Sequence, residues 1–281
     1  MTTSSPAMAD DAAYERAPRP RPPLANRIRE ASRRHHPAVS IAATAVAGYV
    51  AACAVLIGIG LLITHGLHSL SRSELGVNRW FVDHRTSFGN DWTGWASRIA
   101  DTIGILVALA VVVTVLLLRR RGWSALQLAL ALALEVLTFI TVNTVVGRPR
   151  PEVERLGSLP STSSFPSGHT SAMIAIYGSL AIMIGGRSRL RTAVCWVLAI
   201  LATVAVAYAR VYRGMHHLSD VTAGALMGLT MLAVSRAAVR IGEQAAHRSS
   251  ERDEHRESST IPRTTAGKPG PAALDESQVT A

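Results

Sequence analysis

The chain has 281 residues, 48% of them hydrophobic, and a formal net charge of +10. This hydrophobic content favours insertion into a membrane over a soluble core. The arginines cluster just outside the apolar segments, as membrane topology requires, so the positive charge does not indicate a nucleic-acid partner.

The first part of the chain predicts a tail, a span and a surface connection. Residues 1–37 are rich in Pro, Arg, Ala and Asp without apolar periodicity, which predicts a disordered basic tail. The uncharged run at 38–64 exceeds the roughly 20 residues that a helix needs to cross the hydrocarbon core, and predicts the first span. Charges alternate with tryptophans over 65–101, which indicates an interfacial connection with a short amphipathic helix.

Further apolar runs predict five more spans, at 102–118, 123–146, 169–186, 192–208 and 218–238. From residue 243 to 281 the chain is charged and rich in Ser and Thr, which predicts a second disordered tail. The expected fold is therefore all-α, with an integral membrane domain of six transmembrane helices over 38–242.

The loops indicate the orientation of this domain. Arginine-rich connections follow the second and fourth predicted spans, at 119–121 and 187–191, on the same side as both basic tails. The positive-inside rule places that side in the cytoplasm. We therefore expect a multi-pass protein of the plasma membrane, with both termini cytoplasmic and the polar loops 65–101 and 147–167 outside.

Two features inside the predicted spans concern packing. Glu135 lies in the middle of the third span, where an ionisable group should face the bundle interior and find a partner. Gly224 and Gly228 lie four residues apart in the sixth span, which indicates close approach to a neighbouring helix.

Three polar segments, 143–151, 166–169 and 209–220, fall on the outer side and suit an anion. Arg150 and Arg210 can each present a planar fork of donors to phosphate oxygens. Ser167 and Gly168 precede the fourth span, whose free N–H groups and positive dipole end favour negative charge. The missing side chain at Gly168 would let the backbone approach the anion closely.

Two histidines add the groups that phosphoryl transfer requires. His216 and Asp220 stand four residues apart, hence on one helix face if the sixth helix has begun by His216. The carboxylate can then hold one ring nitrogen and leave the other free to attack phosphorus. His169 supplies a second imidazole to protonate the leaving group. This chemistry needs no metal, and because the sequence offers neither a carboxylate cluster nor a CxxC pair, no cofactor is expected.

These motifs resemble the type 2 phosphatidic acid phosphatase (PAP2) family, in its membrane branch of lipid phosphate phosphatases and undecaprenyl-diphosphatase-like enzymes. The family signature has three parts: K-x6-RP, PSGH and SR-x5-H-x3-D. The second part is complete at 166–169, the third matches at Arg210, His216 and Asp220, and the first matches at Arg150 with the proline that follows. The resemblance covers the third to sixth predicted helices.

The resemblance implies a core like that of the haloperoxidases and a metal-independent mechanism. His216 would be the nucleophile and form a phosphohistidine, with Asp220 orienting its ring. His169 would act as general acid and then activate water. The phosphoryl oxygens would be bound by Arg150, Arg210, Ser167 and Gly168.

Two positions depart from the family pattern. Ala209 stands where the family commonly has serine, and Asn143 stands where it usually has lysine. Since the predicted membrane domain contains no lysine, Arg148 could take that role, or Asn143 could donate neutral hydrogen bonds to the phosphate. Substituting lysine for Asn143 is then expected to raise turnover.

The expected activity is hydrolysis of a lipid phosphate or diphosphate at the extracytoplasmic face. Polyprenyl diphosphate, phosphatidic acid and phosphatidylglycerophosphate are open as substrates, and the expected partners are this substrate and the membrane lipids. Haloperoxidase chemistry is an alternative, but those enzymes are soluble and six spans argue against it. The other alternative is a catalytically weakened lipid-phosphate binder or scaffold, for which Asn143 is the distinguishing feature.

Overall fold

A computed structural model of the protein describes residues 37–158, 160–186 and 188–260. Over these residues the regular secondary structure is helical, without strands. Both predicted tails lie largely or partly outside them, since residues 1–36 and 261–281 are not described.

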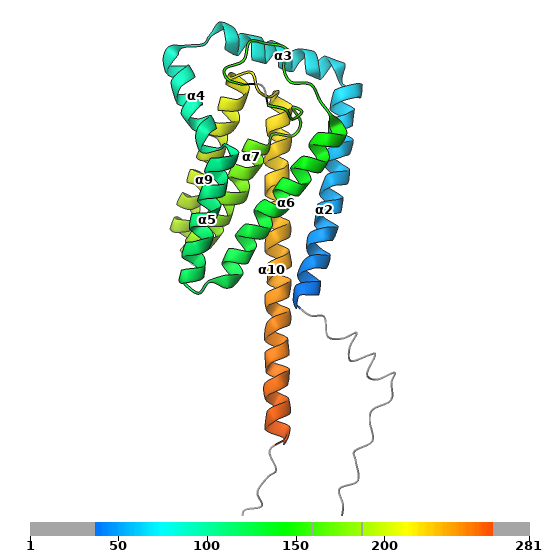
Figure 1. Cartoon of the computed structure of the whole chain (residues 1–281), viewed down its shortest axis with the longest axis vertical. Helices are drawn as coiled ribbons and strands as arrows, with labels where there is room; N and C mark the ends of the chain where they lie inside the picture. Colours follow the sequence, from blue (N-terminus) through cyan, green and yellow to red (C-terminus); the bar gives the residue numbers. More distant parts are fainter. Residues whose placement is uncertain (1–36, 159, 187, 261–281) are drawn as a thin grey trace, which may run out of the picture. The chain divides into compact units, whose positions relative to one another are not determined.

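The helices follow the predicted spans closely (Figure 1). In chain order they are α2 (Pro37–Leu61) with η1 (Leu62–Gly66), α3 (His68–Asp83), α4 (Ser87–Ile99), α5 (Thr102–Leu118), α6 (Gly122–Val146), α7 (Gly168–Met173) with η2 (Ile174–Gly178) and α8 (Ser179–Gly185), α9 (Arg189–Tyr212) and α10 (Leu218–Thr260). Five helical runs are long and apolar enough to cross a membrane, or six if α4 and α5, bent by 49°, form one span. The prediction of an all-α membrane bundle is therefore confirmed.

Local sequence explains where several helices begin and end. Thr86 and Asp101 precede α4 and α5, and each side chain accepts a hydrogen bond from the N–H three residues further on. Such caps satisfy one of the free donors of a first helical turn. At the other end of α6, Gly147 has a φ of +60°, which glycine adopts without strain, and prolines follow it.

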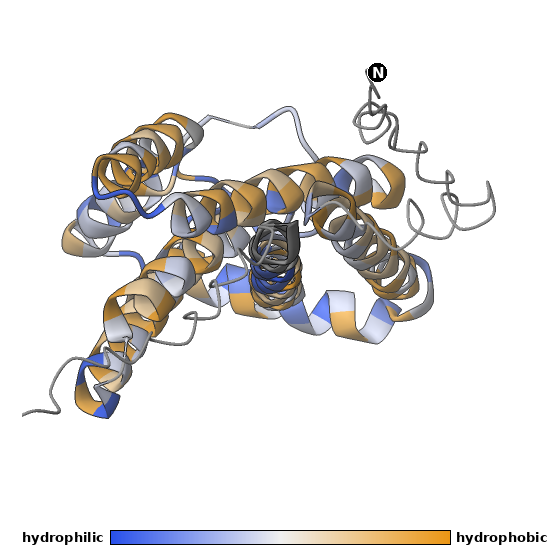
Figure 2. Cartoon of the chain, turned by 90° about the horizontal axis from the view of Figure 1, so that it is seen from below, coloured by the Kyte–Doolittle hydropathy of each residue, from blue (hydrophilic) through white to orange (hydrophobic). Residues whose placement is uncertain are grey.

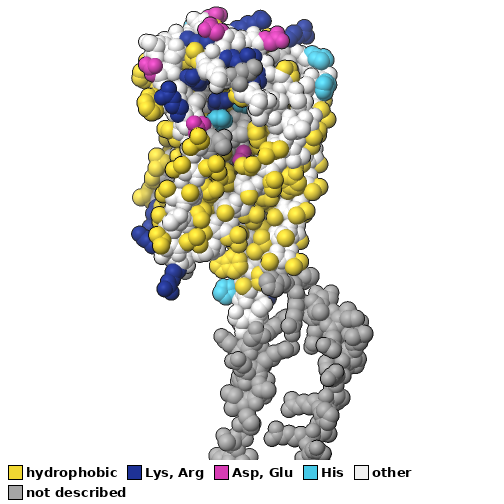
Figure 3. All heavy atoms as spheres, viewed as in Figure 1, with side chains coloured by type: hydrophobic (Ala, Val, Ile, Leu, Met, Phe, Trp, Pro, Cys, Tyr) yellow, Lys and Arg dark blue, Asp and Glu magenta, His cyan; other side chains and the backbone are white. Residues whose placement is uncertain are grey.

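The bundle is organised around α10, which packs against α2, α6 and α7. A buried apolar cluster joins α2, α6 and α10 with the segment before α7, and it includes Leu56, Val142, Phe165 and Met227. Hydrophobic residues predominate along the bundle helices (Figure 2). Many apolar side chains of α5 and α9 are exposed, and they form a band across the middle of the molecule (Figure 3). The hydrocarbon core of a membrane would cover such a band.

Two contacts fix α10 against the start of the fourth span. A Cβ at Gly224 would collide with the carbonyl oxygen of Ser167, and a Cβ at Gly228 would lie 2.6 Å from that of Ser171. The predicted close packing of these glycines is confirmed. Ser171 also donates a hydrogen bond to Glu135, which is buried, so Glu135 has the partner within the bundle that its position predicted.

The helix α3 lies across one end of the bundle (Figure 1). Its buried side chains are polar, Glu74 and Asn78, whereas its apolar residues Leu70, Val77 and Trp80 are exposed. A helix with this arrangement can place its apolar side among lipid headgroups while its polar side faces the protein. The interfacial connection predicted at 65–101 thus consists of two helices, α3 and α4.

The sixth span is longer than predicted. Instead of ending at residue 238, α10 continues to Thr260, so residues 243–260 of the predicted disordered tail are helical. Apolar periodicity is absent there, but Ala, Glu and Arg have high intrinsic helix propensity, which the hydrophobic pattern does not register.

Candidate active site

The three predicted segments meet at the end of the bundle that α3 covers. Backbone contacts tie them together: Ser164 N–H donates to the carbonyl of Arg148 at 2.8 Å, and Ser167 N–H donates to that of Asp220 at 2.9 Å. A guanidinium nitrogen of Arg150 adds a bond of 2.6 Å to the carbonyl of Met215. The loop after α6, the start of α7 and the turn between α9 and α10 therefore form one structural unit.

His216 is buried and its ring is oriented by the backbone. Its Nδ1 lies 2.7 Å from the carbonyl oxygen of Ser164. A carbonyl oxygen can only accept, so Nδ1 carries the proton and Nε2 of the neutral ring carries the lone pair, which accepts a long hydrogen bond from Arg150. Nε2 lies 3.5 Å from a guanidinium nitrogen of Arg150. This is the tautomer that a nucleophilic imidazole requires.

The surroundings keep this ring neutral. Burial and, to a lesser extent, the positive charges of Arg210 and Arg150 lower the pKa of His216 to about 4, against the opposing effect of Asp220. An ordinary histidine would be partly protonated just below neutral pH. His216 is therefore unprotonated, and available for attack on phosphorus, throughout the physiological range.

Asp220 does not hold His216 in the way the sequence predicted. Its carboxylate lies 3.8 Å from Nδ1 of His216, beyond hydrogen-bonding distance, because the carbonyl of Ser164 occupies that position. The carboxylate instead accepts from Arg148 at 2.5 Å, from the N–H of His217 at 2.8 Å and from the hydroxyl of Ser164. Its effect on His216 is therefore that of a nearby negative charge, and the orienting bond comes from Ser164.

Arg148 is not placed to bind phosphate, which corrects the prediction that it could replace the missing lysine. Its guanidinium lies between two carboxylates, 2.8 Å from Glu74 and 2.5 Å from Asp220. It also donates to the hydroxyl of Ser219 at 2.7 Å. The side chain is only 3% exposed, so its donors are used inside the protein.

Asn143 is also placed differently from the prediction. Its amide nitrogen donates to the carbonyls of Ser163 and Phe165 at 3.0 and 3.1 Å, and its amide oxygen accepts from Ser163 N–H at 3.0 Å. Both amide hydrogens are used, so none is left for a phosphate oxygen. The role of Asn143 is to fix the segment that contains Ser164, the residue that orients His216.

The two predicted phosphate-binding arginines do lie at the nucleophile. Arg150 contacts His216, and Arg210 is close enough for the two guanidinium groups to repel one another. Arg210 is buried, and its Nε has no hydrogen-bond partner among the described residues. A buried unpartnered cation beside a second cation is costly, which is the arrangement expected of a site that receives an anion.

His169 lies in the first turn of α7, and the charges of Arg210 and Arg150 act on its ring. The structure thus brings the second predicted histidine to the same site. The N–H groups of this first turn have no carbonyl four residues earlier in the helix to accept from them. The backbone N–H groups of residues 168–170 therefore have no partner within α7 and can donate to an anion.

The roles predicted for Ser167 and Gly168 need correction in detail. The N–H of Ser167 is used by the carbonyl of Asp220, and its hydroxyl lies 3.1 Å from that of Thr170, so its backbone donor is not available to an anion. At Gly168 a Cβ would lie 3.2 Å from the ring of Phe139. The glycine therefore also allows close packing on α6.

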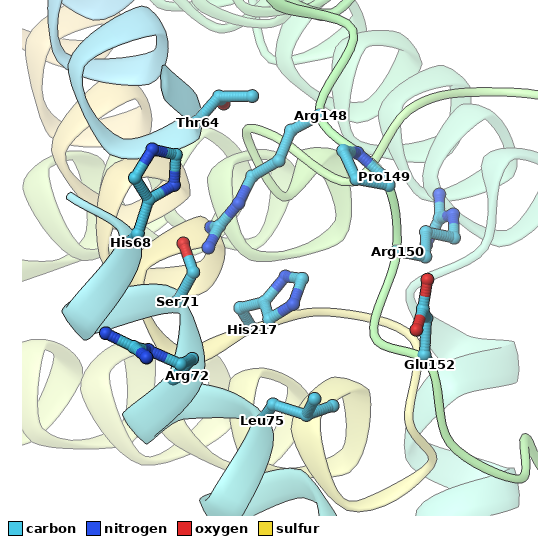
Figure 4. A pocket seen from close by; sticks show the side chains of 10 residues that line it. All are labelled: Thr64, His68, Ser71, Arg72, Leu75, Arg148, Pro149, Arg150, Glu152 and His217. Carbon is cyan, nitrogen blue, oxygen red and sulfur yellow. The ribbon is translucent and has the colours of Figure 1, made fainter. Parts of the chain in front are cut away.

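A cavity of about 490 Å³ adjoins the site on the side of α3 (Figure 4). Arg148, Arg150 and His217 form the wall that it shares with the site, and residues of η1 and α3 form the opposite wall. The complete lining is Thr64, His68, Ser71, Arg72, Leu75, Arg148, Pro149, Arg150, Glu152 and His217. Among the described side chains, no group of three or more His, Cys, Asp or Glu could hold a metal ion.

Several residues of the site were missed by the sequence reasoning. His217, for which no specific role was expected, is buried and bonds Asp220 through its N–H and, at 3.2 Å, through Nδ1. Asn78 donates to the carbonyl of His216 at 3.1 Å, and Glu74 accepts from the N–H of Ser219 at 2.5 Å. One signal was present: Glu74 and Asn78 are four residues apart and share one face of α3.

Comparisons with known proteins identify similar sequences and folds. Residues 124–241 match the model of the PAP2 superfamily. An undecaprenyl-diphosphatase of Sulfolobus acidocaldarius is 38% identical over 69 residues, which cover 25% of this chain and only 30% of that protein.

Two solved structures are also similar. A transmembrane PAP2-type phosphatidylglycerolphosphate phosphatase from Bacillus subtilis superposes with a TM-score of 0.59 and 20% identity, covering 66% of this chain and 94% of its own. Aquifex aeolicus LpxE superposes with a TM-score of 0.48 and 26% identity, covering 58% and 94% of the two chains. The first of these likenesses shows that the two proteins share a fold.

Proposed function

The chain carries a PAP2 superfamily domain at residues 124–241 within a multi-pass membrane protein, and from this premise we propose that it is a metal-independent lipid phosphate phosphatase. The observation that carries the proposal is the environment of His216. Its unprotonated Nε2 accepts a long hydrogen bond of 3.5 Å from Arg150, and the buried Arg210 has an unpartnered nitrogen nearby.

The reaction proceeds in two displacements. Nε2 of His216 attacks phosphorus and forms an N–P bond, while the P–O bond to the lipid breaks and the leaving oxygen takes a proton from His169. Water then attacks the phosphohistidine, His169 accepts its proton, and the N–P bond breaks to release inorganic phosphate and neutral His216. Arg150 and Arg210 stabilise the charge on the phosphoryl oxygens in both steps.

The candidate substrates are polyprenyl diphosphate, phosphatidic acid and phosphatidylglycerophosphate. The local similarity to an undecaprenyl-diphosphatase supports the first. The cavity beside Arg150 supports a substrate with a polar group next to the reacting phosphate, because cavities of roughly 300–1,000 Å³ suit small ligands. We propose that hydrolysis takes place at the extracytoplasmic face, since the arginine-rich loops lie at the other end of the bundle.

Phosphate release by the purified protein tests the function. In detergent, wild-type protein should release phosphate from a panel of these lipids, with chelator present. His216→Ala and His169→Ala should each lower the rate by about 10³-fold or more, because each removes a group that takes part in bond making or breaking. His247→Ala is the matched control, because this exposed histidine lies far along α10 from the site.

Two outcomes would contradict the proposal. One is a strict requirement for Mg²⁺, which the assigned groups do not explain. The other is equal phosphate release by wild-type protein and His216→Ala. Binding of lipid phosphates without turnover would favour the alternative, a binder or scaffold. An acid-labile phosphorylated protein that is absent from His216→Ala would identify the intermediate directly.

A further inference from the structure

We propose that Glu74, on the surface helix α3, is a positioning residue for this phosphoryl transfer and acts on the nucleophile through Arg148 and Asp220. The inference rests on the proposed function and adds a residue that lies outside the matched domain at 124–241. Glu74 touches neither the substrate site nor His216, so its effect is indirect.

The contacts of Glu74 lead directly to the segment that carries the nucleophile. One carboxylate oxygen accepts from Arg148 at 2.8 Å, and the other accepts from the backbone N–H of Ser219 at 2.5 Å. One turn further along α3, Asn78 donates to the carbonyl of His216 at 3.1 Å. Both side chains are buried on the inner face of the helix, so α3 contacts the nucleophile segment at two points.

Glu74, Arg148 and Asp220 form a row of three charges almost without solvent exposure, at 5%, 3% and 0% of their side chains. Figure 4 shows Arg148 extending from the loop after α6 toward α3. With both carboxylates ionised, the row has a net charge of −1. Leaving one of these buried charges without its partner is strongly unfavourable, so the row must be complete to be stable.

This net charge matters for the reaction. When Nε2 of His216 bonds to phosphorus, the ring gains positive charge, and the nearest carboxylate is Asp220, 3.8 Å from Nδ1. Without Glu74, the row would reduce to the ion pair of Arg148 and Asp220, whose net charge is zero. Glu74 therefore preserves the negative field of Asp220 at the ring. The hydrogen bond that Glu74 accepts from the N–H of Ser219 also fixes the backbone next to Asp220 and with it the position of the Asp220 carboxylate.

The test is Glu74→Gln, which keeps the side-chain shape and an acceptor for Ser219 N–H but removes the charge. We expect kcat to fall about 10- to 100-fold, the range seen when outer partners of active-site groups are removed. KM should change less than about threefold, since no substrate contact is lost. Because a negative charge near His216 is removed, protonation of its ring becomes less favourable, and the acid limb of kcat/KM should move to lower pH.

The shift of the acid limb can be assigned to His216 because the structure shows the titratable and charged side chains near this ring. They are Asp220 and His217 at the start of α10, Arg148 and Arg150 after α6, Arg210 on α9, His169 on α7 and Glu74 on α3. A loss of packing alone would lower the melting temperature and kcat but would not displace the acid limb in this direction.

Two further variants complete the experiment. Glu74→Asp keeps the charge in a shorter side chain, so kcat should recover partly and the acid limb should stay at its wild-type position. Asp83→Asn removes an exposed charge from the same helix and should match wild type in both respects. If Glu74→Gln does not fold, Glu74→Asp still decides, because an acid limb displaced by this charge-conserving change would overturn the proposal.

The proposal is also overturned if Glu74→Gln has wild-type kcat, or if its kcat falls with an unmoved acid limb. Failure of the proposed function has a different signature. In that case wild-type protein would release no more phosphate than His216→Ala, and the inference would fall with it.

Discussion

Ser164 contributes to the site in two ways that a motif does not reveal. Its carbonyl fixes the ring of His216, and its hydroxyl bonds the carboxylate of Asp220. Ser164 is in turn held by Asn143, which bonds the backbone of the residues on either side of it. At the residue scale, the orientation of the nucleophile thus depends on backbone geometry in the segment 163–165.

Asn143→Lys is therefore expected to lower phosphate release about tenfold or more, the reverse of what the family pattern alone suggests. Lysine cannot accept from Ser163 N–H, and leaving such buried groups unpaired costs about 1–3 kcal/mol each. Initial rates and melting temperatures of Asn143→Lys should fall together. Asn143→Asp, which keeps the acceptor but leaves the carbonyls of Ser163 and Phe165 unpaired, should fall at least as far. If Asn143→Lys released phosphate at or above the wild-type rate, Asn143 would not be needed to fix the segment 163–165.

The pH dependence of the reaction follows from the low pKa of His216. Protonation removes the nucleophile, so kcat/KM should decrease as the pH falls through the pKa of the free enzyme, which burial lowers to about 4. The acid limb of the profile should thus lie below about pH 5. Initial rates between pH 3 and 8, with a check of folding at each pH, give the measurement. An acid limb near pH 6.5 would show that the ring is solvated like an ordinary histidine.

At the scale of elements, the contact between α10 and α7 sets the depth of the site. Gly224 and Gly228 let α10 approach the carbonyls of Ser167 and Ser171, and the same turn of α7 contains His169. The N–H of Ser167 then reaches the carbonyl of Asp220 at 2.9 Å. The two helix starts that carry His169 and Asp220 are therefore held together by direct backbone contact.

Gly224→Ala should disturb this contact, because the new methyl group has no space beside the Ser167 carbonyl. Overpacking of this kind typically costs about 1–3 kcal/mol, which corresponds to a fall in melting temperature of roughly 2–10 °C. Gly58→Ala on α2 is the matched control, since nothing lies within 4 Å of a Cβ there. Thermal unfolding in detergent separates the two variants. Equal melting temperatures of the two variants would mean that α10 and α7 can move apart without loss of stability.

The sequence predicted the elements well and the connections between side chains less well. Long apolar runs are strong signals, so the spans were expected within a few residues, whereas only one short helix was expected in the connection that contains both α3 and α4. The continuation of α10 to Thr260 was missed because helix propensity without periodicity is a weak signal. The bonds of Asn143, Arg148 and His217 could not be predicted, since each depends on a partner far away in the sequence.

The positions of His169, His216, Arg150 and Arg210 at one site were expected from motif spacing alone. The reason is chemical: each supplies a charge or lone pair that the reaction itself requires. Glu74 and Asn78 act through the backbone and through other side chains. Their residue types follow from the local packing of α3, and no reaction chemistry specifies them in advance.

At the scale of the whole molecule, charge separates the two ends of the bundle. The site and α3 occupy one end, and exposed arginines after α5 and at the start of α9 lie at the other. The positive-inside rule predicts which end faces the cytoplasm. The sidedness of the catalytic end is thus open to direct measurement.

A membrane-impermeant thiol reagent applied to intact cells gives that measurement. In a chain without Cys53 and Cys195, Glu154→Cys near the site should be labelled, and Arg119→Cys at the other end should be labelled only after the cells are opened. Both positions are exposed, so accessibility within the protein does not differ between them. The reverse pattern of labelling would place phosphate release in the cytoplasm.

The length of α10 has a consequence beyond packing. Its 43 residues, at a rise of about 1.5 Å each, extend for about 65 Å, roughly twice the thickness of a hydrocarbon core. Asp220 lies in the first turn of this helix, whose other end extends beyond the bundle (Figure 1). Since a helix of this length cannot lie wholly within the hydrocarbon core, its charged C-terminal part extends past the end of the bundle that lies opposite Asp220.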